Sequence, residues 1–244
     1  MRWGTAAFGW CCAVGLTARL ALAAAGWGAA LEGRPEVGGP LAGAARSREG
    51  AFLLDVLGQS PYAGSAFHGQ PLALRLLRDG GVWSLVAADA LSALLLWVAA
   101  EAMLRRSALG RQAKEGGPVS GSGSHLPASA AAAFLCNPLS VAACVGGSAA
   151  CLEVTAVMAA LAGGALGNPA LAGAGLAGAA YLAPHHALLL LPLGIMLWRG
   201  PEDIAAVSPE AVLPPKAAAV GGGKEDGGGA GSPEEEDVGS MEAE

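Results

Sequence analysis

The sequence has 244 residues, of which 53% are hydrophobic and only 14% are charged. In ordinary soluble domains about a quarter of the residues are charged. The low charge and high apolar content of this chain exclude a disordered polyelectrolyte, a basic nucleic-acid-binding domain and a small disulfide-rich protein. The net charge of −6 is unevenly distributed: residues 1–201 carry 12 basic and 9 acidic side chains, whereas residues 202–244 carry 2 basic and 11 acidic ones.

Residues 1–31 are predicted to be the first transmembrane helix. About 20 apolar helical residues cross a bilayer, and residues 4–31 carry a single charge, Arg19. A cleaved signal peptide is the alternative, because Arg2 precedes an apolar stretch that ends in small residues. Arg19 interrupts that stretch, so we favour a retained helix. An arginine at this depth must reach the membrane interface or find a partner.

Residues 32–81 are predicted to form a loop that ends in an interfacial helix. Ser60-Pro61-Tyr62 indicates a turn, because proline fixes φ and the serine hydroxyl accepts from a nearby backbone amide. From Pro71 onward the spacing predicts a short amphipathic helix, with arginines on one face and leucines largely opposite. The arginines are Arg75 and Arg78, and the leucines are Leu72, Leu76 and Leu77. A cap that packs on the helices without a ligand is the alternative.

Residues 82–104 give the clearest transmembrane helix, with Asp89 inside it and Arg105-Arg106 directly after it. Basic residues mark the cytoplasmic flanks of membrane helices. Residues 105–127, rich in Gly and Ser after these arginines, are therefore predicted to be a mobile cytoplasmic loop. Alternation across the membrane then places residues 32–81 in the lumen.

Residues 128–198 hold one formal charge, Glu153, and are too long for a single helix. Short apolar pieces are tolerated at membrane depth where other protein covers them. The predicted breaks are Asn137-Pro138, Gly146-Gly147, Gly163-Gly164, Gly167-Asn168-Pro169 and Pro184, which leave pieces over 128–145, 149–166, 169–183 and 185–198. The predicted fold class is an all-α, polytopic membrane helical bundle of five or six helices. Over 199–244 an acidic tail follows, and its composition predicts disorder.

A glycine-rich match lies in the last apolar stretch. Residues 173–178 spell G-x-G-x-x-G, but within an Ala/Gly helix rather than the strand–turn–helix unit that binds dinucleotides. We interpret its small residues at spacings of four as surfaces that let helices approach closely in lipid. These pairs are Gly173 with Ala177 and Gly175 with Ala179.

Residue types that often bind metals occur without a metal-site spacing. The five cysteines form no C-x-x-C pair and are interpreted as small core residues. His185-His186 are interpreted as interfacial polar residues, because adjacent side chains on a helix point in different directions. We predict no metal, no cofactor and no catalytic residue.

Residues 49–72 contain the string Glu49-Gly50, Leu54-Asp55, Ser60-Pro61-Tyr62, Gly64, Phe67-His68 and Pro71-Leu72. This string resembles the first luminal loop of the PIG-U family, polytopic subunits of the glycosylphosphatidylinositol (GPI) transamidase. The resemblance continues in order over residues 13–198, at Arg19, Asp89-Ala90-Leu91, Asn137-Pro138, Cys144, Ser148 and Pro192. It covers only the N-terminal half of the family, which carries further membrane passes.

The resemblance implies a non-catalytic scaffold in the endoplasmic reticulum membrane. Such a subunit helps to hold the GPI lipid or the hydrophobic attachment signal, while the thiol nucleophile lies on another, thiol-protease-like subunit. It implies no nucleic-acid partner. The candidate binding and scaffold residues are Asp55, Ser60, Pro61, Tyr62, Phe67, His68, Pro71, Asn137 and Pro138. Arg19 and Asp89 are a candidate intramembrane pair.

Three alternatives have different signatures. A dolichyl-phosphate-mannose-dependent mannosyltransferase of the GPI pathway needs luminal acidic residues, and those of 32–81 include no Asp-Asp or Asp-x-Asp pair. A transporter or channel needs several intramembrane charges along a path, whereas here they are sparse. A truncated, nonfunctional fragment of the scaffold is the third alternative.

Overall fold

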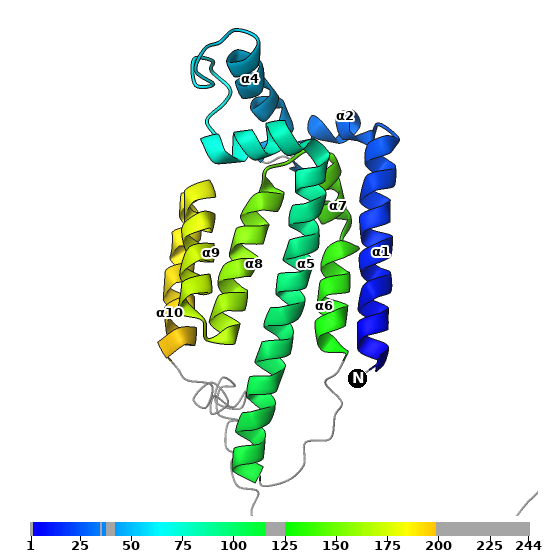
Figure 1. Ribbon diagram of the computed structural model, residues 1–244, viewed down its shortest axis with the longest axis vertical. Helices are drawn as coiled ribbons and strands as arrows, with labels where there is room; N and C mark the ends of the chain where they lie inside the picture. The colour runs from blue at the N-terminus through cyan, green and yellow to red at the C-terminus, as the bar shows by residue number, and fades with distance from the viewer. Residues whose placement is uncertain (1, 35, 38–41, 116–124, 199–244) are drawn as a thin grey trace, which may run out of the picture. The chain divides into compact units, whose positions relative to one another are not determined.

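A computed structural model describes residues 2–34, 36–37, 42–115 and 125–198, and this part of the chain is helical without any strand. The predicted all-α class is therefore confirmed. Figure 1 shows helices packed along one another, with shorter helices lying across one end. The predicted tail over 199–244 lies outside the described residues.

The first predicted helix is two helices. α1 (Arg2–Ala24) ends at a turn, and α2 (Trp27–Glu32) leads away from it across the end of the other helices (Figure 1). Gly26 separates them with a φ of 78°. Glycine adopts this left-handed conformation without the steric cost that a side chain adds, so the change of direction falls at this residue.

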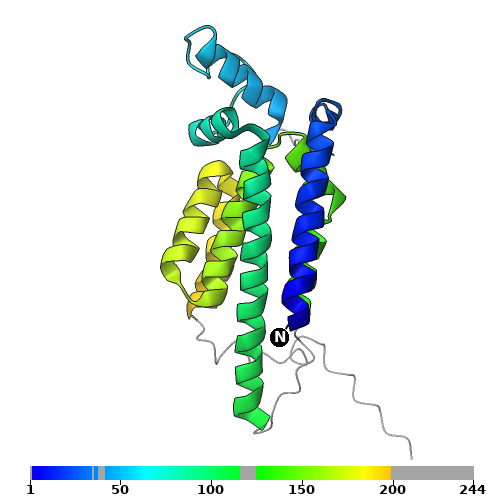
Figure 2. The ribbon, with the colours of Figure 1, turned by 45° about the vertical axis from the view of Figure 1, so that its right-hand side comes forward.

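A kink divides the longest helix. α4 (Ala44–Asp55) is followed by a loop over 56–70 and by α5 (Pro71–Glu115), which has non-helical dihedral angles at Gly81 (φ 51°, ψ −138°). Residues 71–80 lie across the end of the helices, and the remainder of α5 runs along them (Figures 1 and 2).

The crosswise segment begins at Pro71 as predicted, and its interfacial placement stays a prediction. Ala73 and Leu74 are buried, whereas Leu72 and Leu76 are exposed. The buried face is set by packing against α4 and the neighbouring helix ends, and leucine content alone did not indicate it. The predicted loop over 105–127 also differs, because α5 continues as a helix to Glu115; residues 116–124 lie outside the described part.

The apolar stretch after residue 125 divides close to the predicted breaks. Its elements are α6 (Leu126–Leu135), α7 (Pro138–Val145), α8 (Ala150–Leu166), α9 (Pro169–Leu182), the 3₁₀ helix η1 (Pro184–Leu189) and α10 (Leu190–Trp198). Asn137 and Asn168 cap α7 and α9, since their side chains accept from the amides of Leu139 and Leu171. Proline follows each asparagine and fits the first helical turn, where its missing N–H costs no hydrogen bond.

One predicted break is wrong. Gly163-Gly164 lies inside α8, where these glycines allow close helix packing instead of a turn. A Cβ atom on Gly163 would overlap the backbone of Ala172 in α9, and one on Gly175 would overlap the backbone of Ala160 in α8. The interpretation of small residues is therefore confirmed for Gly175 with Ala179, which is also buried, but not for Gly173 with Ala177, which are exposed.

The membrane-span prediction is supported in part. α5 contains a stretch, Pro71–Ala108, that is long and apolar enough to cross a bilayer. α6 and α7, bent by 47° at their junction, meet the same criterion as a pair. The other apolar helices are shorter: Gly9–Ala24, α8, α9 and Pro184–Trp198. The number of passes stays a prediction.

The α8–α9 contact gives a test with a matched control in the same helix. We expect Gly175→Leu to destabilise the chain by about 2 kcal/mol or more, because the new side chain meets backbone rather than a movable neighbour. Gly173→Leu adds the same side chain where nothing lies within 4 Å and is expected to be nearly neutral. Unfolding of the full chain in mixed micelles measures both; equal effects would contradict the packing.

Candidate functional site

A buried ion pair joins α1 to α5. Arg19 donates from Nε to Oδ2 of Asp89 over 2.7 Å, and the two residues are 0% and 1% exposed. The structure therefore brings together the two residues predicted as an intramembrane pair, which lie 70 positions apart in the sequence. A charge buried in an apolar bundle requires such a partner, because desolvation strongly disfavours an isolated ion.

Arg19 also holds the break between α6 and α7. Its Nη1 donates to the carbonyl oxygen of Leu135 over 2.7 Å and to that of Gly15 over 3.0 Å. In a continuous helix the Leu135 carbonyl would accept from the amide of Leu139, but that amide binds the side chain of Asn137. The Asn137-Pro138 break thus frees a carbonyl oxygen that the guanidinium satisfies.

The close approach of α1 to α6 depends on Gly15. A Cβ atom at this position would lie 2.9 Å from the Cβ of Leu135. A larger residue would therefore push the two helices apart and draw the guanidinium away from the Leu135 carbonyl. Sequence reasoning did not single out Gly15, although its place four residues before Arg19 on the same helix face was a usable signal.

The loop over 56–70 contains the predicted turn. The backbone amide of Tyr62 donates to the Ser60 hydroxyl oxygen over 3.3 Å, and the amide of Ala63 donates to the Ser60 carbonyl over 2.9 Å. Pro61 lies between them at the position that its fixed φ favours. Ser60, Tyr62 and Pro71 are exposed, so they shape the loop from its surface.

Phe67 is the centre of this loop. It is 3% exposed, and its ring lies between the backbones of Gly50 in α4 and Gly69, so that a Cβ on either glycine would come within 3 Å of the ring. Tyr62 covers the ring at a centroid distance of 5.4 Å and donates from its hydroxyl to the Gly69 carbonyl over 3.1 Å. The loop is therefore folded around one aromatic side chain.

Three acidic residues at this end form ion pairs with arginines. Asp55 pairs with Arg78 over 3.1 Å, Asp79 pairs with the same arginine over 2.8 Å, and Glu32 pairs with Arg48. Asp55 thus connects the end of α4 to the crosswise segment of α5. Because these pairs are largely exposed, they orient the elements more than they stabilise them.

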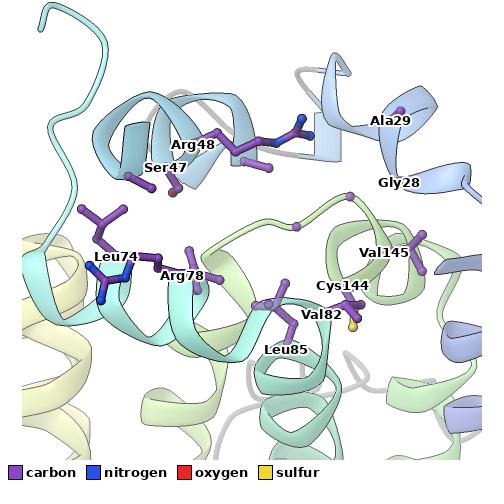
Figure 3. A pocket seen from close by; sticks show the side chains of 16 residues that line it. Gly28, Ala29, Ser47, Arg48, Leu74, Arg78, Val82, Leu85, Cys144 and Val145 are labelled. Carbon is purple, nitrogen blue, oxygen red and sulfur yellow. The ribbon is translucent and has the colours of Figure 1, made fainter. Parts of the chain in front are cut away.

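Two cavities open at this end of the helices. The arginine cavity, about 270 Å³, lies between α2, α4, the α5 kink and α7, and Figure 3 shows Arg48, Arg78, Leu85 and Cys144 along it. The loop cavity, about 600 Å³, is lined by the loop together with α8, α9 and η1. Its lining includes Phe67, His68, Gln70, Glu153, Leu182 and His185.

The predicted site residues therefore fall into two groups. Phe67 and His68 reach the loop cavity, with Ser60, Pro61, Tyr62 and Pro71 as its supporting turn and helix start, and Asp55 as a tether. The second group is the buried pair of Arg19 and Asp89 together with the exposed Asn137-Pro138 break, which frees the carbonyl that Arg19 binds. Sequence reasoning missed the half-buried Glu153 as a cavity residue; its isolation in an apolar stretch was the available signal.

Comparison with known sequences identifies one family. The family described as GPI transamidase subunit PIG-U matches residues 13–219, which run from within α1 to beyond α10. No curated protein matches the chain.

The central place of Phe67 in the loop can be tested against a second phenylalanine, Phe52, as the control. We expect Phe67→Ala to open the loop, because burial of a phenylalanine contributes about 3–5 kcal/mol. Amide hydrogen exchange over 56–70 should become at least about 100-fold faster. Phe52→Ala removes a phenylalanine that is 52% exposed in α4 and should leave this exchange almost unchanged. Unchanged protection in the Phe67 variant would contradict the central place of this ring.

Proposed function

We propose that this chain, which belongs to the PIG-U family of GPI transamidase subunits, is a non-catalytic membrane subunit of that complex. It helps to hold the GPI lipid or the hydrophobic attachment signal while the anchor is joined to a protein. Its partners are the other transamidase subunits, including the thiol-protease-like subunit that carries the nucleophile. It resides in the endoplasmic reticulum membrane as a multi-pass protein.

The loop cavity is the observation that carries this proposal. It lies where the folded loop meets the ends of the apolar helices, and its lining combines polar and apolar side chains from both. His68, Gln70 and Glu153 provide the polar lining, whereas Phe67 and Leu182 provide apolar lining. An amphiphilic ligand, with a polar head and a hydrocarbon or apolar-peptide body, matches this arrangement.

Membrane placement is supported by the two ends of α5. Arg105 and Arg106 lie in the last part of α5 (Pro71–Glu115), and Figure 1 shows that this end of α5 is remote from the loop. The positive-inside rule assigns that end to the cytoplasm and the loop to the lumen. Large apolar side chains on η1 and α10 remain exposed, with Leu188 of η1 81% and Trp198 of α10 91% exposed, which supports lipid or another subunit as their neighbour.

The mannosyltransferase alternative has less support. A glycosyltransferase of that kind needs a free carboxylate at the donor phosphate or the acceptor hydroxyl. Asp55 and Asp79 instead share Arg78, and Glu32 pairs with Arg48. These contacts favour an orienting role for Asp55, Asp79 and Glu32 over a catalytic one.

Complementation tests the proposed function directly. We expect this chain, expressed in cells that lack the family subunit, to restore a GPI-anchored reporter at the cell surface and to co-purify with the other subunits. Arg19→Leu should reduce co-purification several-fold, because Asp89 then lacks its partner. Arg75→Leu, which removes an exposed arginine of the crosswise segment, is the control.

The outcomes separate the alternatives. Restoration without co-purification, or unchanged co-purification of the Arg19 variant, would contradict the scaffold role. Mannose transfer from a labelled dolichyl donor that disappears in Asp55→Asn would establish the enzyme instead. A chain that stays in carbonate-washed membranes but restores no reporter would favour the nonfunctional fragment.

A further inference from the structure

Three potential metal ligands meet inside the bundle. Asp89 from α5, Cys144 from the end of α7 and Cys151 from the start of α8 each place one ligand atom within 4.8 Å of the other two. All three residues are buried, with exposed fractions of 1%, 0% and 3%. They come from three separate helices, so the cluster is a product of the fold and has no counterpart in sequence spacing. We propose that Asp89, Cys144 and Cys151 bind a zinc ion.

The ligand types select the metal. Two thiolates and one carboxylate favour zinc over magnesium or calcium, which prefer oxygen ligands alone. Tetrahedral zinc with Zn–S bonds of about 2.3 Å places its ligand atoms about 3.5–4 Å apart. Ligand atoms that already lie within 4.8 Å therefore need only small side-chain movements. Three protein ligands leave the fourth position for water or another small ligand.

Charge balance also favours zinc. The charges of the Arg19 guanidinium and the Asp89 carboxylate cancel across their ion pair. Zinc binding releases two protons, one from each thiol, and forms two Zn–S bonds. The two thiolate charges cancel the charge of Zn²⁺, so the buried cluster stays neutral and avoids the cost of an uncompensated ion.

Arg19 holds the carboxylate for this purpose. Its Nε binds Oδ2 of Asp89 over 2.7 Å and so leaves Oδ1 for a metal, as hydrogen-bonded carboxylate ligands do in metal sites. Its Nη2 is buried without an acceptor among the described residues. A water molecule or anion bound at the fourth position of the zinc would provide a hydrogen-bond acceptor for this Nη2.

A route to the cluster is present. Cys144 lies at the wall of the arginine cavity, as Figure 3 shows, and the cavity opens between α4 and the helix ends. Because Cys144 is 0% exposed, entry of a metal ion requires the side chains at this wall to move. Once bound, it would link α5, α7 and α8 at the end where the loop is mounted.

Metal content tests this proposal on the full chain, purified in detergent after exposure to zinc and removal of free metal. Mass spectrometry of the metal should find about one zinc ion per chain. Cobalt added to the metal-free chain should give the charge-transfer absorbance of cobalt–thiolate bonds. Cys144→Ser and Cys151→Ser should each lower zinc retention by roughly tenfold or more. Cys136→Ser removes an exposed cysteine and should retain the metal.

Several results would overturn it. The first is that the wild-type chain contains no zinc and gives no cobalt–thiolate band. The second is that all three variants retain zinc equally. The third is that the chain is lighter by two hydrogens, because Cys144 and Cys151 form a disulfide. The wild-type readouts do not depend on how the variants fold. Because they measure metal rather than GPI attachment, they also stand apart from the test of the proposed function.

Discussion

The Arg19–Asp89 ion pair is the interaction on which the arrangement of the bundle depends. Arg19 lies in an otherwise apolar helix, and its charge requires compensation wherever that helix is buried. Asp89 supplies the opposite charge from α5, and the Leu135 carbonyl supplies a second acceptor from α6. One side chain thus fixes three helices relative to one another. If hydrophobic residues replaced Arg19 and Asp89, they would add apolar contacts but would not fix the direction of the contact. Fixing one specific arrangement is the best-supported role of buried polar groups.

Backbone breaks convert this bundle into a platform for the loop. Gly81 turns α5 sharply, so that residues 71–80 cross the helix ends and carry the loop over 56–70. The break at Asn137-Pro138 bends α6 against α7 and frees the carbonyl that Arg19 occupies. Phe67 then closes the loop on itself beside the loop cavity. The proposed holding of an amphiphile follows from this junction between folded polar loop and apolar helices.

Local chemistry made much of this fold predictable, and long-range packing accounts for the rest. Asn-Pro pairs and the Gly167 turn indicate helix ends because proline and glycine act on the adjacent backbone. Gly163-Gly164 is also a glycine pair of the kind that often marks a break, but it lies inside α8, and Gly163 packs against α9. Only the tertiary structure shows this packing. The turn at Ser60 was predictable for the same local reason, whereas the approach of Cys144 to Cys151 and Asp89 was not, because no periodicity links α5, α7 and α8. The pairing of Arg19 with Asp89 was a hypothesis based on their opposite charges. The hydrogen bonds that Arg19 makes with Asp89 and Leu135 could be known only from the fold.

A double-mutant cycle on the full chain tests the central claim most directly. Unfolding free energies in mixed micelles are compared for Arg19→Leu, Asp89→Leu and the chain with both changes. If the ion pair fixes the bundle, each single change costs about 3–5 kcal/mol through the charge left behind, and the second change adds little or restores stability. Effects that simply add would show that the two side chains act independently and would contradict the account.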